Sequence, residues 1–257
     1  CMARIAVVEL GAGRRAIARV EGGDLRKGPL YLIDPATGAI RTLGQRAQDD
    51  IAMPVMSSPL AADVMGRGYD QVVYALRSRG YEFDVVDPIS GALVQRWKLP
   101  DRHMLLLPGY GTSTPTPLLQ FAPLPLWQQP WAAGDWDHDG RAEIFAGAFT
   151  SYGPDSRFAL YVLKSDGSEQ RLRLPSDFSK PTHLMIADID GDGRSELVAS
   201  LTDKDDGTAL YAWKPDRLNE PRLLARIEDG GPGVLQLENV GGQAVLVHFG
   251  VAKTTAL

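Results

Sequence analysis

The feature that most limits the fold of this chain is a unit of about 50 residues that recurs along it. Three segments superpose without gaps: "AADVMGRGYDQVVYA" from Ala61, "AGDWDHDGRAEIFAG" from Ala133 and "IADIDGDGRSELVAS" from Ile186. "VVELGAGRRAIARV" and "LQLENVGGQAVLVHF" are weaker copies. The first acidic residues of the five copies, at intervals of 54, 72, 53 and 50 residues, are Glu9, Asp63, Asp135, Asp188 and Glu238. Repetition at this period is typical of propellers and repeat arrays.

A second landmark follows each of the first four copies, in tight-turn sequences such as "YLIDPATGAI" and "DVVDPISGAL". It lies 25, 24, 29 and 26 residues after the acidic residue, at Asp34, Asp87, Lys164 and Lys214. Short runs rich in β-branched and aromatic residues fill each unit, and convincing helical periodicity is missing. Each unit therefore reads as strand, acidic loop, strand, turn, strand, tight turn and strand, which is one propeller blade.

We predict an all-β protein, a β-propeller of four-stranded blades that forms a single domain over residues 1–257. The repeats start near residues 3, 57, 129, 182 and 233, giving four full units and a partial one. After "AVLVHF" only "GVAKTTAL" remains, so the last unit is expected to lack its third and fourth strands. Ring closure would need a blade shared between the two ends or residues beyond this sequence, as in a larger propeller.

A proline-rich insertion at residues 101–130 accounts for the long second interval, the 72 residues between Asp63 and Asp135. It is rich in apolar side chains and lacks the repeat pattern. Two interpretations stay open: the segment packs against the propeller, or it forms a partner-binding surface.

Composition argues against several functional classes and structural features. The formal net charge is −5, the pI is near 5.4, and there is no dense Lys/Arg block, which argues against nucleic-acid binding. No apolar stretch approaches the roughly 18 to 20 residues of a membrane-spanning helix, so we expect no transmembrane segment. The only cysteine, Cys1, excludes an internal disulfide and fits either the lipid-anchored start of a mature bacterial lipoprotein or the start of a fragment.

Two loops, at residues 135–143 and 188–196, share the pattern D-x-D-x-D-G-R-x-E. Oxygens from positions 1, 3 and 5 converge as the chain curls, and glycine at position 6 permits the positive φ of the turn. Without a cation, two carboxylates ~4 Å apart would repel by about 4 kcal/mol at an effective dielectric constant near 20. Oxygen ligands without His or Cys favour calcium over zinc or copper. We therefore predict two calcium sites.

An EF-hand is the first alternative, because its loop opens in the same way. It requires a bidentate glutamate at position 12 and flanking helices. Position 12 is Ala146 in one loop and Ala199 in the other, and the exits "IFAGAF" and "LVASL" read as strands. The EF-hand is rejected.

"DWDHDGRAEIFAG" and "DIDGDGRSELVAS" resemble the calcium loops of FG-GAP/VCBS-type repeats, which form the blades of integrin α-subunit propellers and of many bacterial surface proteins. The resemblance implies a propeller in which calcium ions brace the turn between the first two strands of a blade. The ligands that it implies are Asp135, Asp137, Asp139, the carbonyl of Arg141, Glu143, Asp188, Asp190, Asp192, the carbonyl of Arg194 and Glu196.

The copy at Asp63 departs from this pattern, because positions 3, 5 and 9 are Met65, Arg67 and Gln71. We predict no ion there and expect the Arg67 guanidinium to pair with Asp63 instead. The outer copies at Glu9 and Glu238 lack the other acids, and no ion is predicted for them either. "SSPLAADVMGRGYDQVVYAL" also resembles the blades of quinoprotein-like propellers.

Signals for an enzyme are weak. Gly11-x-Gly13-x-x-Ala16 nearly matches a dinucleotide fingerprint, but "EGG" cuts the following segment too short for the helix that this site requires. No nucleophile motif occurs, and no catalytic or organic-cofactor residue is assigned. The histidines, which show no metal-ligand spacing, are His103, His138, His183 and His248. The aromatic residues expected in the core are Trp131, Trp136, Tyr161, Tyr211 and Trp213.

The leading functional hypothesis is a calcium-braced propeller of an exported bacterial protein, at the surface or in the periplasm. It would act in adhesion or protein–protein interaction, with a protein or glycan ligand on one propeller face. One alternative is a propeller enzyme, either a calcium-dependent polysaccharide lyase or a quinoprotein-like oxidoreductase. Another is a periplasmic assembly scaffold that docks through the insertion.

Overall fold

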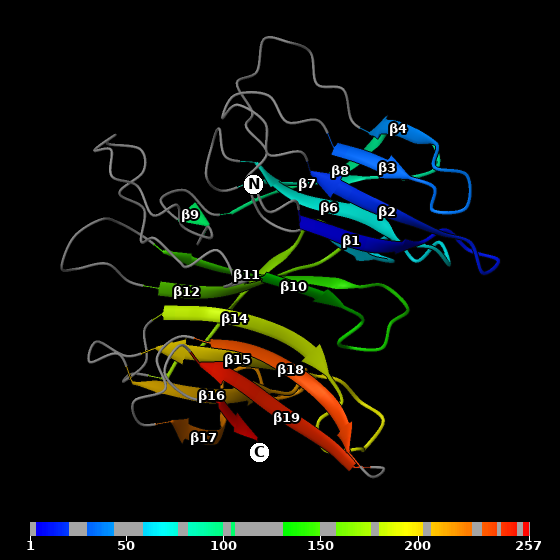
Figure 1. Cartoon of the computed structure of the whole chain (residues 1–257). Helices are drawn as coiled ribbons and strands as arrows, with labels where there is room; N and C mark the ends of the chain where they lie inside the picture. The colour runs from blue at the N-terminus through cyan, green and yellow to red at the C-terminus, as the bar shows by residue number, and fades with distance from the viewer. Residues whose placement is uncertain are drawn as a thin grey trace, which may run out of the picture. The chain divides into compact units, whose positions relative to one another are not determined.

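The computed structural model describes residues 4–20, 30–43, 59–76, 82–99, 104–105, 131–149, 158–175, 180–202, 207–227, 233–240, 243–250 and 254–256. These residues form twenty β-strands and no helix (Figure 1). The expected all-β class is therefore confirmed. Within this part of the chain, no helix is long and apolar enough to cross a membrane.

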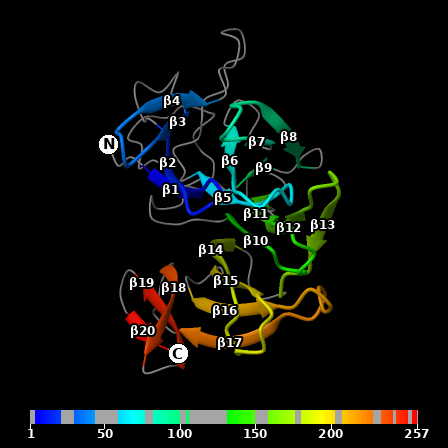
Figure 2. The same cartoon turned by 90° about the vertical axis from the view of Figure 1, so that its right-hand side faces the viewer.

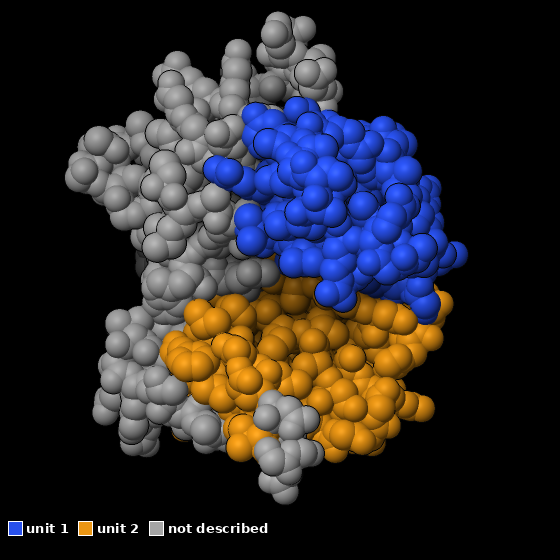
Figure 3. Space-filling model, turned by 45° about the vertical axis from the view of Figure 1, so that its right-hand side comes forward, with its two compact units in different colours: residues 1–105, 140–142, 164–168 blue, residues 106–139, 143–163, 169–257 orange. Residues whose placement is uncertain are grey.

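The chain divides into two compact units, which Figure 3 distinguishes by colour. Unit 1 comprises residues 1–105, 140–142 and 164–168, and contains two four-stranded sheets. Its strands are β1 (Arg4–Glu9), β2 (Arg15–Val20), β3 (Leu30–Ile33), β4 (Ile40–Leu43), β5 (Leu60–Ala62), β6 (Gln71–Leu76), β7 (Glu82–Val86), β8 (Leu93–Lys98) and β9 (Met104–Leu105).

Unit 2 comprises residues 106–139, 143–163 and 169–257. It holds sheets of order β10-β11-β12-β13, β14-β15-β16-β17 and β18-β19-β20. Its strands are β10 (Trp131–Gly134), β11 (Glu143–Phe149), β12 (Phe158–Leu163), β13 (Glu169–Leu172), β14 (Lys180–Ala187), β15 (Glu196–Thr202), β16 (Thr208–Trp213), β17 (Arg222–Ile227), β18 (Gly233–Val240), β19 (Gln243–Gly250) and β20 (Thr254–Ala256).

With β9 left aside, the strands of each sheet follow chain order and neighbouring strands run antiparallel, as in the β14 to β17 sheet of Figure 2. The predicted order of strand, loop, strand, turn, strand, tight turn and strand is thus confirmed for four full repeats. One detail was wrong: the last repeat has a third strand, because Thr254–Ala256 pairs with β19. Three residues are too few to show a hydrophobic pattern, yet the long strand β19 offers them a free edge to pair with.

Burial within a sheet depends on the strand's place in it. The middle strands β15 and β16 are buried along their whole length, whereas the outer strands β13 and β17 are largely exposed. A continuous apolar run such as that of β15 suits a strand covered on both faces. The middle strands therefore lie between sheets, as blade strands do.

Among the described residues, three hydrophobic cores each lie between two successive sheets. In unit 1, Val8 and Ala18 from the first sheet pack with Val72 and Val86 from the second. In unit 2, one core joins the β10–β13 and β14–β17 sheets, and another joins the β14–β17 and β18–β20 sheets. These stacked sheets are consistent with propeller blades.

The first strands of successive sheets neighbour one another: β1 and β5 in unit 1, and β10, β14 and β18 in unit 2. At the end of β10 the approach is very close, because a Cβ placed on Gly134 would lie 2.9 Å from Cγ2 of Ile186 on β14. Gly134 immediately precedes the first acidic loop. Close packing of first strands therefore fixes the position from which that loop departs.

Two predictions fall outside the described residues: the role of Cys1 and the conformation of the insertion at residues 101–130, of which only β9 is described. The organisation of residues 1–257 as a single domain also stays a prediction.

Candidate metal centre

Both acidic loops connect the first and second strands of a sheet. The first joins β10 to β11 and the second joins β14 to β15. Strand pairing closes each loop at its base, where Gly134 faces Glu143 and Ala187 faces Glu196. The ninth-position glutamate thus begins a strand, directly across from the residue that precedes the first aspartate.

The loop backbone turns through left-handed conformations at two positions. Gly140 and Gly193, at position 6, have φ values of 85° and 83°, which confirms the role predicted for this glycine. Position 4 is also left-handed, with φ of 59° at His138 and 75° at Gly191. The sequence analysis did not predict this second turn, although Gly191 is a residue type that commonly adopts positive φ.

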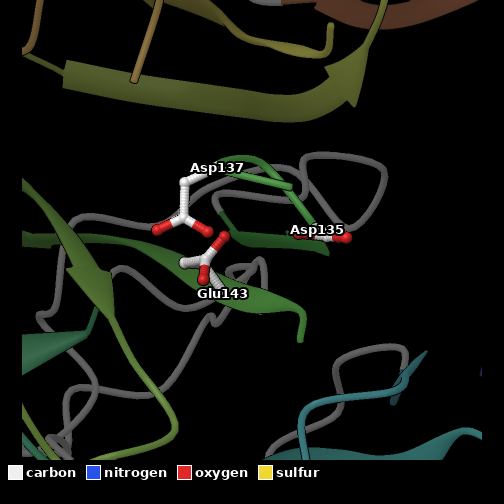
Figure 4. Close-up of side chains that lie close together, drawn as sticks. All are labelled: Asp135, Asp137 and Glu143. Carbon is white, nitrogen blue, oxygen red and sulfur yellow. The ribbon is translucent and has the colours of Figure 1, made fainter. Parts of the chain in front are cut away.

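In the first loop the carboxylates of Asp135, Asp137 and Glu143 converge, with one oxygen from each lying within 4.8 Å of the others. Figure 4 shows Asp137 and Glu143 directed toward each other. Glu143 is only 2% exposed, and its Oε2 accepts a hydrogen bond of 2.9 Å from the backbone N–H of Trp136. The buried indole of Trp136 packs edge-on against Phe145, with ring centroids 5.2 Å apart. The residue that donates to Glu143 is therefore anchored in the hydrophobic core.

In the second loop Asp188, Asp190 and Glu196 converge in the same way, again with oxygens within 4.8 Å of one another. Glu196 is fully buried, and its Oε2 accepts a hydrogen bond from Ile189 N–H. Both oxygens of Asp188 accept backbone hydrogen bonds, 2.7 Å from Gly191 and 2.9 Å from Gly193. Loop amides thus compensate the charge of the first aspartate.

A lysine lies among the remaining acids of the second loop. The Nζ of Lys214 is 2.9 Å from Asp190 Oδ2, 2.7 Å from Asp192 Oδ2 and 3.1 Å from Glu196 Oε1. Hydrogen bonds to Asp192, Asp190 and Glu196 raise the pKa of the Lys214 ammonium above its usual range. The same lysine, with the N–H of Arg194, lowers the pKa of Asp192. Lys214 stood out in the sequence as the tight-turn residue 26 positions after Asp188, but it was not predicted to contact the acidic loop.

The fifth-position acids, Asp139 and Asp192, are not part of the two convergent groups. Asp192 instead accepts a hydrogen bond of 2.8 Å from the backbone N–H of Arg194. Coordination by these two aspartates and by the carbonyls of Arg141 and Arg194 stays a prediction. The first, third and ninth positions are the ones that the structure brings together.

The copy at Asp63 keeps the loop backbone without the acids. Asp63 accepts hydrogen bonds from the backbone N–H groups of Arg67 and Gly68, at 2.8 and 2.6 Å. The expected ion pair between the Arg67 guanidinium and Asp63 was wrong, because this guanidinium pairs with Asp87 at 2.5 Å. Since backbone amides already occupy both Asp63 oxygens, the guanidinium turns to the carboxylate that follows β7.

Gln71 takes the place of the ninth-position glutamate in this copy. It is fully buried, its Oε1 accepts a hydrogen bond of 2.8 Å from Met65 N–H, and its Nε2 donates one of 2.7 Å to Tyr69 O. The ninth side chain therefore braces the loop backbone whether or not it is charged.

The two convergent groups suit a hard cation. Their donors are carboxylate oxygens without histidine or cysteine, and each includes a buried glutamate. Burial away from water makes unbalanced negative charge unfavourable, so a cation or a positive side chain is required. The first group fits a calcium ion, and the second fits one if Lys214 moves away.

The other residues singled out in the sequence occupy structural positions. The five expected core aromatics are buried, at 7% exposure or less, which confirms that prediction. The segment after Gly13 is strand β2 and not a helix, as expected. His138 is exposed, in agreement with a solvated position, and its Nε2 also accepts a 3.3 Å hydrogen bond from Ser195 N–H in the second loop.

Comparison with known proteins supports the assignment of the repeats. Residues 135–199, which contain both acidic loops, match the family model described as FG-GAP-like repeat. The resemblance to FG-GAP-type repeats is therefore confirmed for that segment. No curated protein matches the chain.

Among solved structures, the chain is similar to one described as the crystal structure of BBS1N in complex with ARL6DN, soaked with lead. The identity is 10% and the TM-score is 0.42, over 94% of this chain and 74% of the other.

Proposed function

We propose that this protein is a calcium-braced β-propeller that serves protein–protein interaction. The observation that carries the proposal is the convergence of Asp135 and Asp137 with the buried Glu143, within a segment similar to FG-GAP-like repeats. The sheets are antiparallel, follow chain order and stack core to core, which is how propeller blades are built. Such a scaffold leaves recognition to the loops that connect its strands.

Calcium would act as a brace in this proposal. The ion would be held by Asp135, Asp137 and Glu143 in one loop and by Asp188, Asp190 and Glu196 in the other. In each case it would tie the loop to the start of the second strand, where the glutamate lies. An ion at ten times its dissociation constant adds about 1.4 kcal/mol of stability per site.

An extracytoplasmic location agrees with this use of calcium, since extracellular modules bind the ion at about 0.1–1 mM. Adhesion, with a protein or glycan ligand on one propeller face, remains the form of interaction that we propose.

Thermal unfolding tests the calcium part. The melting temperature should fall when a chelator is added and recover with calcium but not with equimolar magnesium, which demands octahedral geometry and gives up its waters reluctantly. The Asp137→Asn variant disables one of the two proposed sites and should lose about half of this response. Asp216→Asn, a change at an exposed aspartate beyond the loop, is the matched control and should keep it. A melting curve of the wild type that ignores both chelator and calcium would refute the proposal.

A further inference from the structure

The loops at residues 63–71 and 188–196 carry the same ion pair with its charges reversed. Position 5 is Arg67 in one loop and Asp192 in the other. The residue that follows the third strand is Asp87 in the first case and Lys214 in the second. Arg67 and Asp87 lie 2.5 Å apart, and Lys214 and Asp192 lie 2.7 Å apart. Both repeats therefore use these two positions to neutralise the loop from within the chain.

Lys214 goes further than Arg67, because it also contacts two of the three residues that converge in the second loop. Its Nζ lies 2.9 Å from an oxygen of Asp190 and 3.1 Å from an oxygen of Glu196. That Glu196 oxygen, Oε1, is buried, and the Lys214 ammonium nitrogen lies 3.1 Å from it. The ammonium group is thus the positive charge that this buried oxygen faces.

A calcium ion and this ammonium group cannot use the same carboxylates together. Calcium needs several oxygens at about 2.3–2.6 Å. An ammonium nitrogen at hydrogen-bond distance from both Asp190 and Glu196 fills the space in which such an ion would sit, and the two positive charges repel each other. The Lys214 side chain is one-third exposed, so it has solvent into which it can withdraw.

We propose that Lys214 is an internal counter-cation that competes with calcium for the second acidic loop. The inference rests on the proposed function in so far as calcium is the competing ion. In the absence of calcium, Lys214 neutralises Asp190, Asp192 and Glu196 and keeps the loop folded. Calcium binds there only by displacing the lysine, so Lys214 sets the calcium affinity of this loop.

Isothermal titration of the full chain with calcium chloride tests the competition. The second loop is isolated by substituting Asp135→Asn and Asp137→Asn in the first, and Lys214→Met is then added to that background. We expect the calcium dissociation constant to fall by about tenfold, because binding no longer has to break three ion pairs. Arg217→Met is the matched control: it removes a positive charge three residues away, on a side chain that is 67% exposed and lies 4.0 Å from Asp216.

The outcomes separate the two proposals. A gain in affinity of about fivefold or more over the Arg217→Met control supports the competition, and so does calcium binding that appears only in the lysine variant. A smaller gain overturns it while leaving the proposed calcium sites intact. Absence of calcium binding in the wild type and in every variant at millimolar concentration overturns the proposed function itself.

A second measurement uses the wild type and does not depend on the folding of a variant. Acetylation of Lys214 by an activated ester, followed by peptide mass spectrometry, reports how accessible the amine is. Calcium that binds the second loop should expose Lys214 and raise its labelling rate, while the rate at Lys98 on β8 serves as the internal reference. If titration shows calcium binding and the labelling of Lys214 does not rise, the competition is refuted.

Discussion

The loops at residues 63–71 and 188–196 share one backbone and differ in their charges. Both turn through left-handed glycines at positions 4 and 6, and in both the first aspartate accepts the N–H of the sixth residue. In both, the ninth side chain reaches back to a backbone N–H near the loop start. Yet the loop at residues 63–71 has Arg67 and Gln71 where the loop at residues 188–196 has Asp192 and Glu196.

The difference teaches that the loop frame does not depend on a metal ion. Asp63 and Gln71 hold it by hydrogen bonds to the backbone alone. The acids of the second loop are an addition to that frame, and they require a cation. In the structure Lys214 supplies it, and we propose that calcium can take its place.

Placing the ninth residue of one loop in the other should have the largest effect on stability. Gln71→Glu places a carboxylate in a fully buried position where Nε2 now donates to Tyr69 O. An unpaired buried charge opposite a carbonyl should lower the free energy of unfolding by about 3 kcal/mol at pH 7. Urea denaturation measures the loss.

The converse exchange is the matched control. Glu196→Gln keeps an acceptor for Ile189 N–H and loses the ion pair with Lys214, so about 1 kcal/mol should be lost. Equal losses of unfolding free energy for the two exchanges would contradict the account, because it requires a neutral side chain at Gln71 and tolerates one at Glu196.

Acid should weaken the strand that leads into the second loop. Burial, together with the nearby His248, lowers the pKa of His183 on β14 to about 4. Because the folded-state pKa lies below the ordinary value of 6.5, the stabilisation is complete above that value and is lost as pH falls toward 4. Unfolding free energies should be about 2 kcal/mol lower at pH 5 than at pH 8.

His183→Gln should flatten that pH profile in chelator, where calcium binding makes no contribution. His248, whose pKa burial also lowers, would leave a smaller dependence of the same sign. A pH profile that is unchanged in the variant would show that a group other than His183 causes the loss of stability in acid.

A common frame predicts a common penalty for alanine at position 6. Gly68 and Gly193 both have positive φ, and neither has an atom within 4 Å of a Cβ placed on it. Gly68→Ala and Gly193→Ala should therefore each lower the unfolding free energy by about 1 kcal/mol, from backbone strain alone. Chelator should be present in both measurements. A several-fold difference between the two losses would mean that the loops do not share a backbone conformation.

Charge reversal of the ion pair at the loop of residues 63–71 should have the smallest effect on stability, because Arg67 is partly exposed. Arg67→Asp alone and Asp87→Lys alone should each lower the melting temperature. The double variant reproduces the charges of Asp192 and Lys214 and should lose less than the sum of the two single losses, although the hydrogen bonds by which Asp87 caps its turn stay lost. Additive losses in the double-mutant cycle would contradict an equivalent pairing in the two repeats.

Much of the fold could be predicted because short sequence patterns mark the strands and turns of each repeat. Turn residues and short apolar runs placed the strands of four sheets, and the glycine at position 6 marked a left-handed turn. The strand Thr254–Ala256 could not be predicted, since it is defined by pairing with β19 and not by its own sequence.

The acidic loops were recognised from their spacing, but their charge partners were not. Lys214 follows Asp188 by 26 residues, and Asp87 follows Asp63 by 24, so only the folded sheet brings them to the loops. The landmark residues had been interpreted as turn formers. Asp87 does cap its turn, accepting hydrogen bonds from Ile89 and Ser90, and it binds Arg67 as well.

Crystal structures of the wild type at low and at saturating calcium test the central claim most directly. At low calcium, Lys214 Nζ should lie among Asp190, Asp192 and Glu196. At saturation, anomalous density should appear about 2.3–2.6 Å from oxygens of Asp188, Asp190 and Glu196, with Lys214 turned out to solvent. Calcium and Lys214 bound together in that loop, or no calcium in either acidic loop at any concentration, would contradict the account.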